Sequence, residues 1–470
     1  MTVSRRGVLG GAAALSLAAI SARAAAGADL DVAVVGGGVA GAYAAWRLRS
    51  EQPGSRVRLF ETSERIGGRL HSVAFPQAPH LVGEAGGMRF LPAQKHVANL
   101  VKHLNLPARG YPVDAPYERL ELRGRSFSLA EIGQPTKLFP YNIPAADQSP
   151  KSMLFLQSME RIVPGAKTMT AAKWRRIRAG VRYKGRLLKD WAAWTLLADV
   201  LTMEEMRFLQ DASGYDDVSL HETGLDQFDF IFLGDDESKP FLTIAGGYQR
   251  LPLTLAQEAG TAGAGIEMKT RLASLSVPAA ANEYFHLGLL DRIGRRSAVT
   301  AKRVVLALPR RAIETVAISP VNSLFNDLVS VEPVPACKAL LLYPKPWWRD
   351  LGIVGGRSIT DAPARQFYAL GAEKERLPSE AANGFGVLMM YCDANSAEYW
   401  KELAPPSPAG GFQWLSGDSQ LAMEVHREAG LVYRTTPPKP LSACFQDWTA
   451  APWPRRHRAC RSRDEADRRS

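Results

Sequence analysis

Near the start of the chain, apolar residues change from a strand-like to a helix-like pattern. Residues 31–35 form a short β-branched run, which is typical of a buried parallel strand. Residues 42–48 have helical character, and residues 57–60 form a second short apolar run. This order predicts a βαβ unit whose first turn is the glycine-rich segment 36–41.

The glycine-rich turn has the spacing of a dinucleotide-binding site. Gly36 permits a tight turn, Gly38 lets the backbone approach a pyrophosphate, and Gly41 lets the helix pack closely on the strand. The N-terminus of the following helix then faces the phosphate charge. We expect the cofactor to contact Gly36, Gly38, Val39, Ala40 and Gly41.

An acidic residue follows the second predicted strand. Glu61 lies twenty residues after Gly41, where a carboxylate accepts a hydrogen bond from a ribose hydroxyl and disfavours a 2′-phosphate. The strand, the glycines, the helix, the second strand and the acid occur in the required order. We therefore interpret this segment as a nucleotide site rather than as a purely structural glycine turn.

The residues after Glu61 distinguish between nucleotide cofactors. The segment 61–70 contains Gly67, Gly68 and Arg69, and it resembles the extended fingerprint of the FAD-dependent amine oxidase and L-amino acid oxidase family. The resemblance implies that Arg69 contacts the FAD diphosphate, and a guanidinium suits that anion because it forms paired, charge-assisted hydrogen bonds. We expect FAD rather than NAD. The resemblance also implies an α/β fold with a Rossmann-like FAD-binding domain, a mixed-sheet substrate domain and a helical insertion.

A second segment extends the resemblance. Residues 86–92 resemble the family segment that passes beside the flavin, which assigns Gly86, Gly87 and Met88 to the cofactor. In L-amino acid oxidases this segment offers an arginine to the substrate carboxylate. The resemblance therefore implies that Arg89 is a carboxylate clamp, and an arginine in a structural ion pair is the alternative.

Two further candidates come from apolar segments in the second half of the chain. Lys338 precedes Trp348 by ten residues, and the matching lysine of the family hydrogen-bonds a water beside flavin N5, so we expect Lys338 to be catalytic. Its alternative is a lysine whose charge reaches the surface. Tyr391 falls where L-amino acid oxidases place an aromatic ring over the substrate, and a core tyrosine is its alternative.

The resemblance divides the chain into discontinuous domains. The FAD-binding domain is expected at 29–72, 243–328 and 435–453, and the substrate domain at 73–135 and 329–434. Amphipathic patterning predicts a helical domain at 140–235. In L-amino acid oxidases the corresponding domain forms the entrance to the active site.

The first 27 residues are expected to be a signal peptide. Arg5 and Arg6 precede a mostly apolar stretch that reaches Ile20, and residues 22–24 offer a small-residue cleavage site. The adjacent arginines resemble a twin-arginine export signal, while an ordinary secretory signal or an uncleaved anchor is the alternative. We therefore expect a periplasmic or secreted protein with no stable membrane span after cleavage.

Composition and charge narrow the classes of partner. A chain of 470 residues with 46% hydrophobic residues is long enough for more than one domain and is neither collagen-like nor disordered. The net charge of +11 includes +3 from residues 1–27 and +4 from residues 454–470, so residues 28–453 carry only +4. We expect no nucleic-acid partner. The four cysteines lack metal-ligand spacing, so we expect no metal site and mostly buried thiols, or a disulfide after export.

The C-terminal residues depart from the family. Its members end with a third FAD segment, a glycine-rich turn and helix, whereas this chain keeps the family register through Trp453 and then becomes arginine-rich. Residues 454–470 lack glycine, so we expect this segment to be missing, through a frameshift or a truncation. A genuine disordered basic tail is the alternative.

These motifs predict that the chain uses FAD and O2 to oxidise an L-amino acid to a 2-oxo acid, ammonia and hydrogen peroxide. A monoamine or polyamine oxidase shares the cofactor motifs, and a flavin-dependent desaturase remains a further alternative. An inactive remnant is the third, because of the altered C-terminus. The sequence predicts neither the side chain of the substrate nor the oligomeric state.

Overall fold

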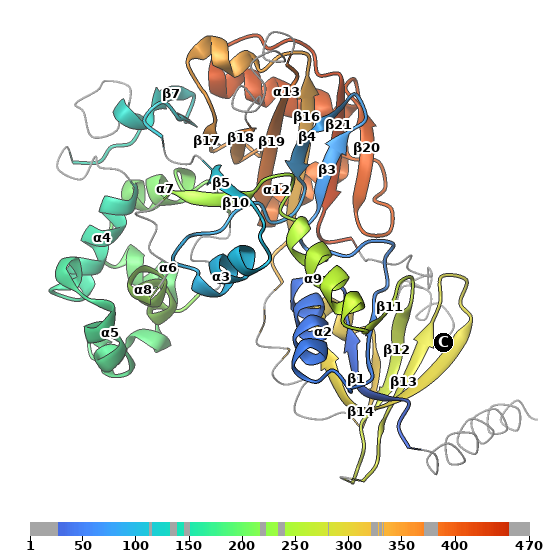
Figure 1. Cartoon of the computed structure of the whole chain (residues 1–470). Helices are drawn as coiled ribbons and strands as arrows, with labels where there is room; N and C mark the ends of the chain where they lie inside the picture. The colour runs from blue at the N-terminus through green and yellow to red at the C-terminus, as the bar shows by residue number, and fades with distance from the viewer. Residues whose placement is uncertain are drawn as a thin grey trace, which may run out of the picture.

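The computed structural model contains two large β-sheets and a separate group of helices (Figure 1). It describes residues 27–111, 115–131, 139–144, 151–216, 222–233, 240–280, 282–320, 328, 331, 333–370 and 384–450. Almost all of the expected signal peptide and the whole of the expected basic tail lie outside these residues. The mixed sheets and helices confirm the predicted α/β class.

The first sheet has seven strands and contains the predicted βαβ unit. Its spatial order is β11-β2-β1-β14-β13-β12-β15. The strands are β1 (Leu30–Val35), β2 (Val57–Phe60), β11 (Gly265–Glu267), β12 (Arg271–Ser276), β13 (Phe285–Leu290), β14 (Arg296–Leu306) and β15 (Ala317–Ser319). β1 runs parallel to β2 on one side and to β14 on the other, which explains its uninterrupted apolar sequence. The predicted strands at 31–35 and 57–60 are confirmed.

Two helices lie side by side on one face of this sheet, namely α2 (Val39–Glu51) and α9 (Arg250–Thr261) (Figure 1). Ala42 and Ala45 of α2 are fully buried against the sheet, and Leu255 of α9 belongs to the same core. Alanine at these positions lets α2 approach β1 closely. The short helix α10 (Arg310–Ile313) follows β14.

The second sheet has eight strands in the order β20-β21-β16-β19-β18-β17-β6-β7. Their bounds are β6 (Arg119–Leu122), β7 (Arg125–Ser128), β16 (Ala336–Tyr343), β17 (Gly356–Thr360), β18 (Gln366–Leu370), β19 (Gly386–Asp393), β20 (Phe412–Ser416) and β21 (Ser442–Asp447). Helices α12 (Ala394–Leu403) and α13 (Gln420–Tyr433) contribute buried side chains to the core on one face of this sheet. Successive residues of a strand point to opposite faces, so β16 gives Cys337 to that core and Lys338 to the other face.

One expected domain boundary is corrected by this sheet. Residues 435–453 were expected in the FAD-binding domain, with the strands of the seven-stranded sheet. Their strand β21 instead pairs antiparallel with β16 on one edge and with β20 on the other. Both edges of its backbone are therefore committed to the eight-stranded sheet, whose other strands come from the segments expected to form the substrate domain.

Short elements connect the two sheets. The hairpin of β3 (Ser72–Phe75) and β4 (Ala78–Glu84) shares a core with the face of the eight-stranded sheet that bears Lys338. β5 (Ala108–Tyr111) pairs with β10 (Phe241–Ile244), and α3 (Lys95–His103) lies between β4 and β5 in the chain. These segments bring residues from distant parts of the sequence to one face of the second sheet.

The helical part contains α4 (Lys151–Ile162), α5 (Ala171–Ile177), α6 (Ala193–Ala198), α7 (Met203–Asp211) and α8 (Gly224–Leu233). A short hairpin of β8 (Arg182–Tyr183) and β9 (Arg186–Leu187) follows α5. The core of the helical part surrounds Trp174, whose ring stacks on Phe228 of α8. A buried arginine attaches this part to the eight-stranded sheet, because Arg365 pairs with Asp216 at 2.9 Å.

Within the described residues, none of the helices combines the length and the apolar character that a membrane crossing requires. Three of the four cysteines are buried free thiols, as expected: Cys337, Cys392 and Cys444. Cys460 lies outside the described residues.

Candidate active site

The glycine-rich turn joins β1 to the N-terminus of α2. Gly36 has a φ of 106°, a conformation that disfavours any side chain. Gly41 packs against the same turn, since a Cβ atom on Gly41 would lie only 1.8 Å from the Gly36 carbonyl oxygen. Gly38 caps α2 without a side chain, so the first-turn N–H groups of Val39 and Ala40 have no intrahelical acceptor. These amides form an anion site of the kind that binds a pyrophosphate.

The acidic residue after β2 holds the glycine-rich turn. Glu61 Oε2 accepts a hydrogen bond from the Gly37 N–H at 2.6 Å, and Oε1 accepts one from the Ser63 N–H at 2.7 Å. Each carboxylate oxygen has a second lone pair, so Glu61 retains the capacity to accept a hydroxyl. Its predicted contact with a ribose stays a prediction.

The second glycine pair lies directly beside the first turn. The Gly67 N–H donates to the Gly37 carbonyl at 2.9 Å, and Gly67 and Gly68 both have positive φ. Arg65 stabilises this loop by donating to the carbonyls of Gly68 and Leu70 at 2.8 and 3.0 Å. Burial lowers the pKa of Arg65. The fingerprint residues of the two loops therefore form one surface.

Arg69 connects this surface to the second predicted cofactor segment. Its carbonyl accepts a hydrogen bond from the Gly87 N–H at 2.9 Å, while its side chain is exposed. A Cβ atom on Gly86 would lie 2.2 Å from the same carbonyl oxygen. Only glycine fits at position 86, because the two backbones cross here. The structure thus brings together Arg69, Gly86 and Gly87, which sequence reasoning assigned separately to the cofactor.

Lys338 holds the segment that contains Gly86. Its Nζ donates to the carbonyls of Glu84 and Gly86 at 3.1 and 2.6 Å. The intervening carbonyl of Ala85 accepts a hydrogen bond from Trp448 Nε1 at 2.9 Å. Lys338 is only 4% exposed, which rules out its alternative as a lysine that reaches the surface. The predicted contact of Lys338 with a water beside the flavin is not tested by this geometry.

A buried carboxylate lies next to this lysine. Burial lowers the pKa of Lys338 to about 7, against the opposing attraction of Glu84. Burial likewise raises the pKa of Glu84 to about 7, although its oxygens accept hydrogen bonds from the Tyr248 N–H at 2.6 Å and the Ser72 hydroxyl at 2.8 Å. Near neutral pH, a small change in surroundings therefore changes the charge of both groups.

The lowered pKa of Lys338 predicts a specific pH dependence of stability. The stability of Lys338→Met, measured relative to that of the native protein, should be higher below pH 7 than at pH 10. In the folded protein Lys338 loses its proton near pH 7, but in the unfolded chain only near 10.5. The native protein therefore gains up to about 1.4 kcal/mol per pH unit between these values, and the gain vanishes as the pH falls to 7.

Denaturant unfolding of the native protein and the variant at about pH 6, 8 and 9.5, in buffers of the same ionic strength, measures this difference. Lys102→Met is the matched control, because Lys102 is exposed on α3. A difference between native protein and Lys338→Met that does not change with pH would contradict the assignment.

Arg89 lies among three aromatic rings. Its Cζ is 4.1 Å from the ring centroid of Phe241, 5.7 Å from that of Tyr368 and 5.9 Å from that of Tyr111. Ring faces partly stabilise a desolvated cation. The buried Nη1 nevertheless has no hydrogen-bond partner among the described residues. Arg89 also forms no ion pair among the described residues, which therefore give no support to the alternative that Arg89 belongs to a structural ion pair.

Met88 and Tyr111 join the surroundings of Arg89 to Lys338. Met88 Sδ accepts a hydrogen bond from the Tyr111 hydroxyl at 3.3 Å and lies 3.5 Å from Lys338 Nζ. The positive charge of Arg89 also contributes to the lowered pKa of Lys338. The two predicted cationic residues thus lie in one site.

A polar row crosses the apolar face of the eight-stranded sheet. Lys338 on β16 pairs in register with Tyr391 on β19 and with Gln446 on β21, and Tyr391 pairs with Gln366 on β18. The ring centroid of Tyr391 lies 5.7 Å from Lys338 Nζ, and burial raises the pKa of Tyr391. Sequence reasoning missed both glutamines, which are fully buried. Gln366 is the first residue of β18 and Gln446 precedes Asp447 at the end of β21, so neither has the apolar residues on both sides that identified Lys338.

The ends of this row contact segments outside the sheet. Gln446 Nε2 donates to the Gly410 carbonyl at 2.8 Å, which leaves Oε1 to accept from His71 Nδ1 at 3.0 Å. Burial lowers the pKa of His71 to about 4, so His71 is neutral. At the other end, Gln366 Nε2 donates to the Gly214 carbonyl at 2.7 Å. The adjacent Tyr215 packs edge-on against Tyr391, which brings the helical part to the site.

These residues fit a bound FAD. The glycine turn and the N-terminus of α2 suit its pyrophosphate, because a side chain at Gly41 would collide with the turn and no side chain among the described residues caps the helix. The segment around Gly86 leads from that turn to the polar row. The unpartnered Arg89 Nη1 offers a donor to an anionic group at the far end of the site.

Comparisons with known proteins identify relatives along nearly the whole chain. The family model for flavin containing amine oxidoreductases matches residues 39–468. Achacin from Lissachatina fulica is 25% identical over 453 residues, which cover 90% of this chain and 82% of achacin. The L-amino-acid oxidase of Demansia vestigiata is 25% identical over 385 residues, which cover 79% of this chain and 68% of that enzyme.

The solved structures agree at the level of the fold. Wild-type putrescine oxidase bound to putrescine has a TM-score of 0.62 with this chain and covers 90% of it, with 86% of the oxidase covered. At 17% identity this likeness shows the fold alone. Because the family model spans far more than half of the sequence, the chain belongs to the flavin containing amine oxidoreductase family and is an FAD-dependent amine oxidoreductase.

Proposed function

We propose that this protein is an L-amino acid oxidase. The observation that carries the proposal is Arg89, whose buried Nη1 lacks a hydrogen-bond partner among the described residues. Arg89 as a whole is half-buried, but a guanidinium nitrogen that is shielded from water and lacks an acceptor is unfavourable, and a substrate carboxylate would supply both the charge and the acceptor. A simple amine has no such group. This argument favours amino acids over monoamines and polyamines.

The residues of the site would divide the work between cofactor and substrate. We assign the FAD pyrophosphate to Gly36, Gly38, Val39, Ala40 and Gly41, with Glu61 at the ribose and Arg69 at the diphosphate. Gly86, Gly87 and Met88 would lie along the flavin. When bound, FAD would supply the redox chemistry, namely the uptake of a hydride from the substrate α-carbon and the transfer of the electrons to O2 to give hydrogen peroxide. Water would then convert the released imino acid to a 2-oxo acid and ammonia.

The side chains around the substrate would orient it. Arg89 would hold the carboxylate through paired hydrogen bonds, which fixes two points of the substrate and thereby the direction of its α-carbon. Tyr391 would close one side of the pocket with an apolar ring face. Lys338 would keep the Glu84–Gly86 backbone, and with it Arg89, in position, in addition to its predicted contact with a water.

Peroxide formation tests the proposal directly. The purified, FAD-loaded protein is incubated with each of the twenty amino acids and with their decarboxylated amines, and hydrogen peroxide is recorded. We expect peroxide from at least one L-amino acid and little from the corresponding amine. Oxidation of amines alone would indicate a monoamine or polyamine oxidase, and a flavin-loaded protein that oxidises neither class would indicate a desaturase or another substrate class.

The visible spectrum of the purified protein separates these outcomes from a remnant. The expected loss of the third FAD segment concerns residues 454–470, which lie outside the described residues, while the family match extends to residue 468. An active enzyme must retain flavin after gel filtration. A colourless chain that gains no flavin band when FAD is added would support the remnant.

We also propose that the chain is exported through the twin-arginine signal at its N-terminus. Arg5 and Arg6, the apolar stretch and the small residues at 22–24 support this proposal. Twin-arginine export carries folded proteins, which suits a protein that loads FAD in the cytoplasm. Sequencing the N-terminus of the mature protein tests it, and an intact Met1 in a cytoplasmic fraction would count against it.

A further inference from the structure

Positive charge is concentrated in one segment of the helical part. Residues 161–189 contain ten lysines and arginines and no aspartate or glutamate. Residues 28–453 as a whole carry only +4, so the rest of that range is net acidic. The segment therefore produces a strong local positive potential although the overall charge is modest, and this potential reaches further from the surface at low salt. The segment includes α5, the β8–β9 hairpin and the turns that join them.

Three of these cations are neutralised by acids from neighbouring elements. Arg161 pairs with Glu205, Lys184 with Asp199, and Arg178 with Asp229. The others are exposed and form no ion pair among the described residues: Lys167, Lys173, Arg175, Arg176, Arg182, Arg186 and Lys189. We call these seven residues the basic patch.

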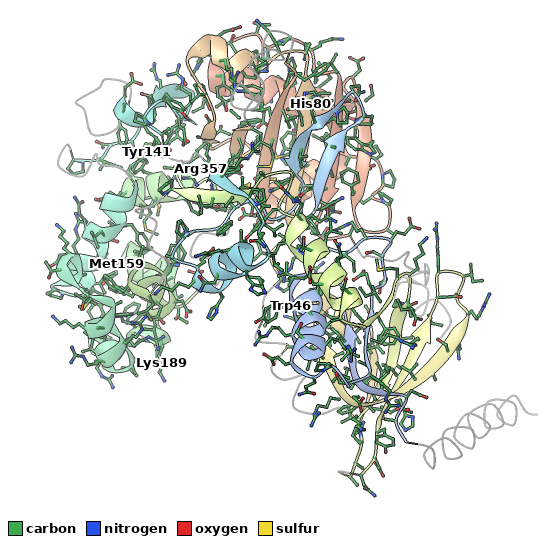
Figure 2. All side chains as sticks on the ribbon, viewed as in Figure 1. Trp46, His80, Tyr141, Met159, Lys189 and Arg357 are labelled. Atoms are coloured by element: carbon green, nitrogen blue, oxygen red, sulfur yellow. The ribbon has the colours of Figure 1, made fainter. Side chains whose placement is uncertain are left out.

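The basic patch lies at the outer end of the helical part. Figures 1 and 2 show α5 and Lys189 on the side of the helical part that faces away from both large sheets. The patch is thus separate from the polar row that crosses the eight-stranded sheet around Lys338. Binding of a large partner here would leave that row uncovered.

Exposed apolar side chains accompany the cations. Ile177 is 38% exposed between Arg176 and Arg178, at the end of α5. Phe230, on the adjacent helix α8, is 67% exposed. Cations alone would suit any polyanion, but isolated phosphates offer nothing to an isoleucine or a phenylalanine. A lipid bilayer offers both anionic headgroups and an apolar layer beneath them.

We infer that the basic patch docks the protein on the surface of a bilayer that contains anionic lipids. The unpaired cations contact the lipid phosphates, and Ile177 and Phe230 enter the boundary between headgroups and acyl chains. Each lysine or arginine near such a surface contributes about a fivefold gain in affinity. The interaction does not depend on the proposed oxidase activity, and peroxide formation reports separately on that activity.

Co-sedimentation with lipid vesicles tests the inference. The mature chain is mixed with vesicles of phosphatidylglycerol and phosphatidylcholine, or of phosphatidylcholine alone, and the bound fraction is measured at low and at high salt. The patch variant carries Lys173→Gln, Arg175→Gln, Arg176→Gln and Lys189→Gln. The control variant carries Lys95→Gln, Lys102→Gln, Arg296→Gln and Arg311→Gln, which are exposed residues outside the patch. Both variants lose the same net charge.

We expect the patch variant to bind the anionic vesicles at least about a hundredfold more weakly than the native protein, and the control variant to change by less than about tenfold. Ile177→Ser with Phe230→Ser should weaken binding at high salt, where charge contributes least. Equal losses in the two charge variants would overturn the inference, because attraction would then depend on total charge. Binding to duplex DNA without binding to vesicles, or full displacement by inorganic phosphate, would overturn it as well.

Discussion

Arg89→Ala is expected to lower kcat/KM for an L-amino acid by about a hundredfold to a thousandfold, mainly through KM. The guanidinium is surrounded by the rings of Phe241, Tyr368 and Tyr111, and its Nη1 has no partner among the described residues. The substrate carboxylate would therefore form an ion pair with a half-buried guanidinium, at the nitrogen that is shielded from water. Its loss leaves a buried carboxylate unpaired, which costs far more than loss of a surface contact.

The substrate itself provides the sharpest control for this prediction. The amine that lacks the carboxylate should be oxidised no more slowly by Arg89→Ala than by the native enzyme, since the deleted group has nothing to hold. Arg89→Lys should be intermediate, because lysine keeps the charge but not the paired donors. Steady-state peroxide assays with both substrates measure these effects.

Two control measurements show whether a loss of activity comes from misfolding or from the loss of any arginine. The flavin spectrum of Arg89→Ala should match that of the native protein, which shows that the cofactor site has folded. Arg296→Ala, at an exposed arginine of β14, should leave all constants unchanged. An Arg89→Ala enzyme with an unchanged KM for its amino acid would contradict the assignment of the clamp.

The sequence predicted the nucleotide site well because that site is local. β1, the glycine turn, α2, β2 and Glu61 follow one another within a short stretch, and each has a periodicity or a residue type of its own. The structure adds only the hydrogen bond from the Gly37 N–H to the Glu61 carboxylate, and both residues lie within the same short stretch.

The surroundings of Arg89 could not be predicted in this way. Tyr111, Phe241 and Tyr368 come from three separate strands, and nothing in the sequence around any of them indicates that they meet. A single aromatic residue in an apolar strand is usually a core residue. Only the tertiary fold, which pairs β5 with β10 and places both near β18, brings them to one guanidinium.

The sheet that β21 joins could not be predicted either, for a related reason. Residues 435–453 were placed by the resemblance alone, and the sequence of a short strand does not indicate which sheet it joins. β21 pairs with β16, about a hundred residues earlier in the chain, and this pairing brings Gln446 next to Lys338. A polar residue inside an apolar run identified Lys338, but Gln446 lies next to Asp447 and Gln366 next to Arg365, so the burial of the two glutamines depends on the tertiary fold.

Gly41→Ala should abolish stable FAD binding, which is the second large effect expected. The added Cβ would lie 1.8 Å from the Gly36 carbonyl oxygen and 3.3 Å from the Ala307 side chain, so α2 must move away from β1 and β14. Alanine favours a helix over glycine by about 1 kcal/mol, but a backbone overlap of this size exceeds that gain, since overpacking costs about 1–3 kcal/mol or more. Movement of α2 also removes its N-terminal amides from the phosphate position.

Absorbance of the purified variant in the flavin band, relative to protein, measures the loss. Gly54→Ala is the matched control, because no atom lies within 4 Å of a Cβ at Gly54, and it should retain full occupancy. Should Gly41→Ala unfold, the flavin content of its remaining folded fraction still decides the question, because folding and phosphate binding place different demands on α2. The core under α2 needs only Ala42 and Ala45 to remain buried, whereas the pyrophosphate needs the helix N-terminus held at a fixed distance from Gly36. A folded Gly41→Ala protein with normal flavin content would therefore show that the nucleotide does not bind at this turn.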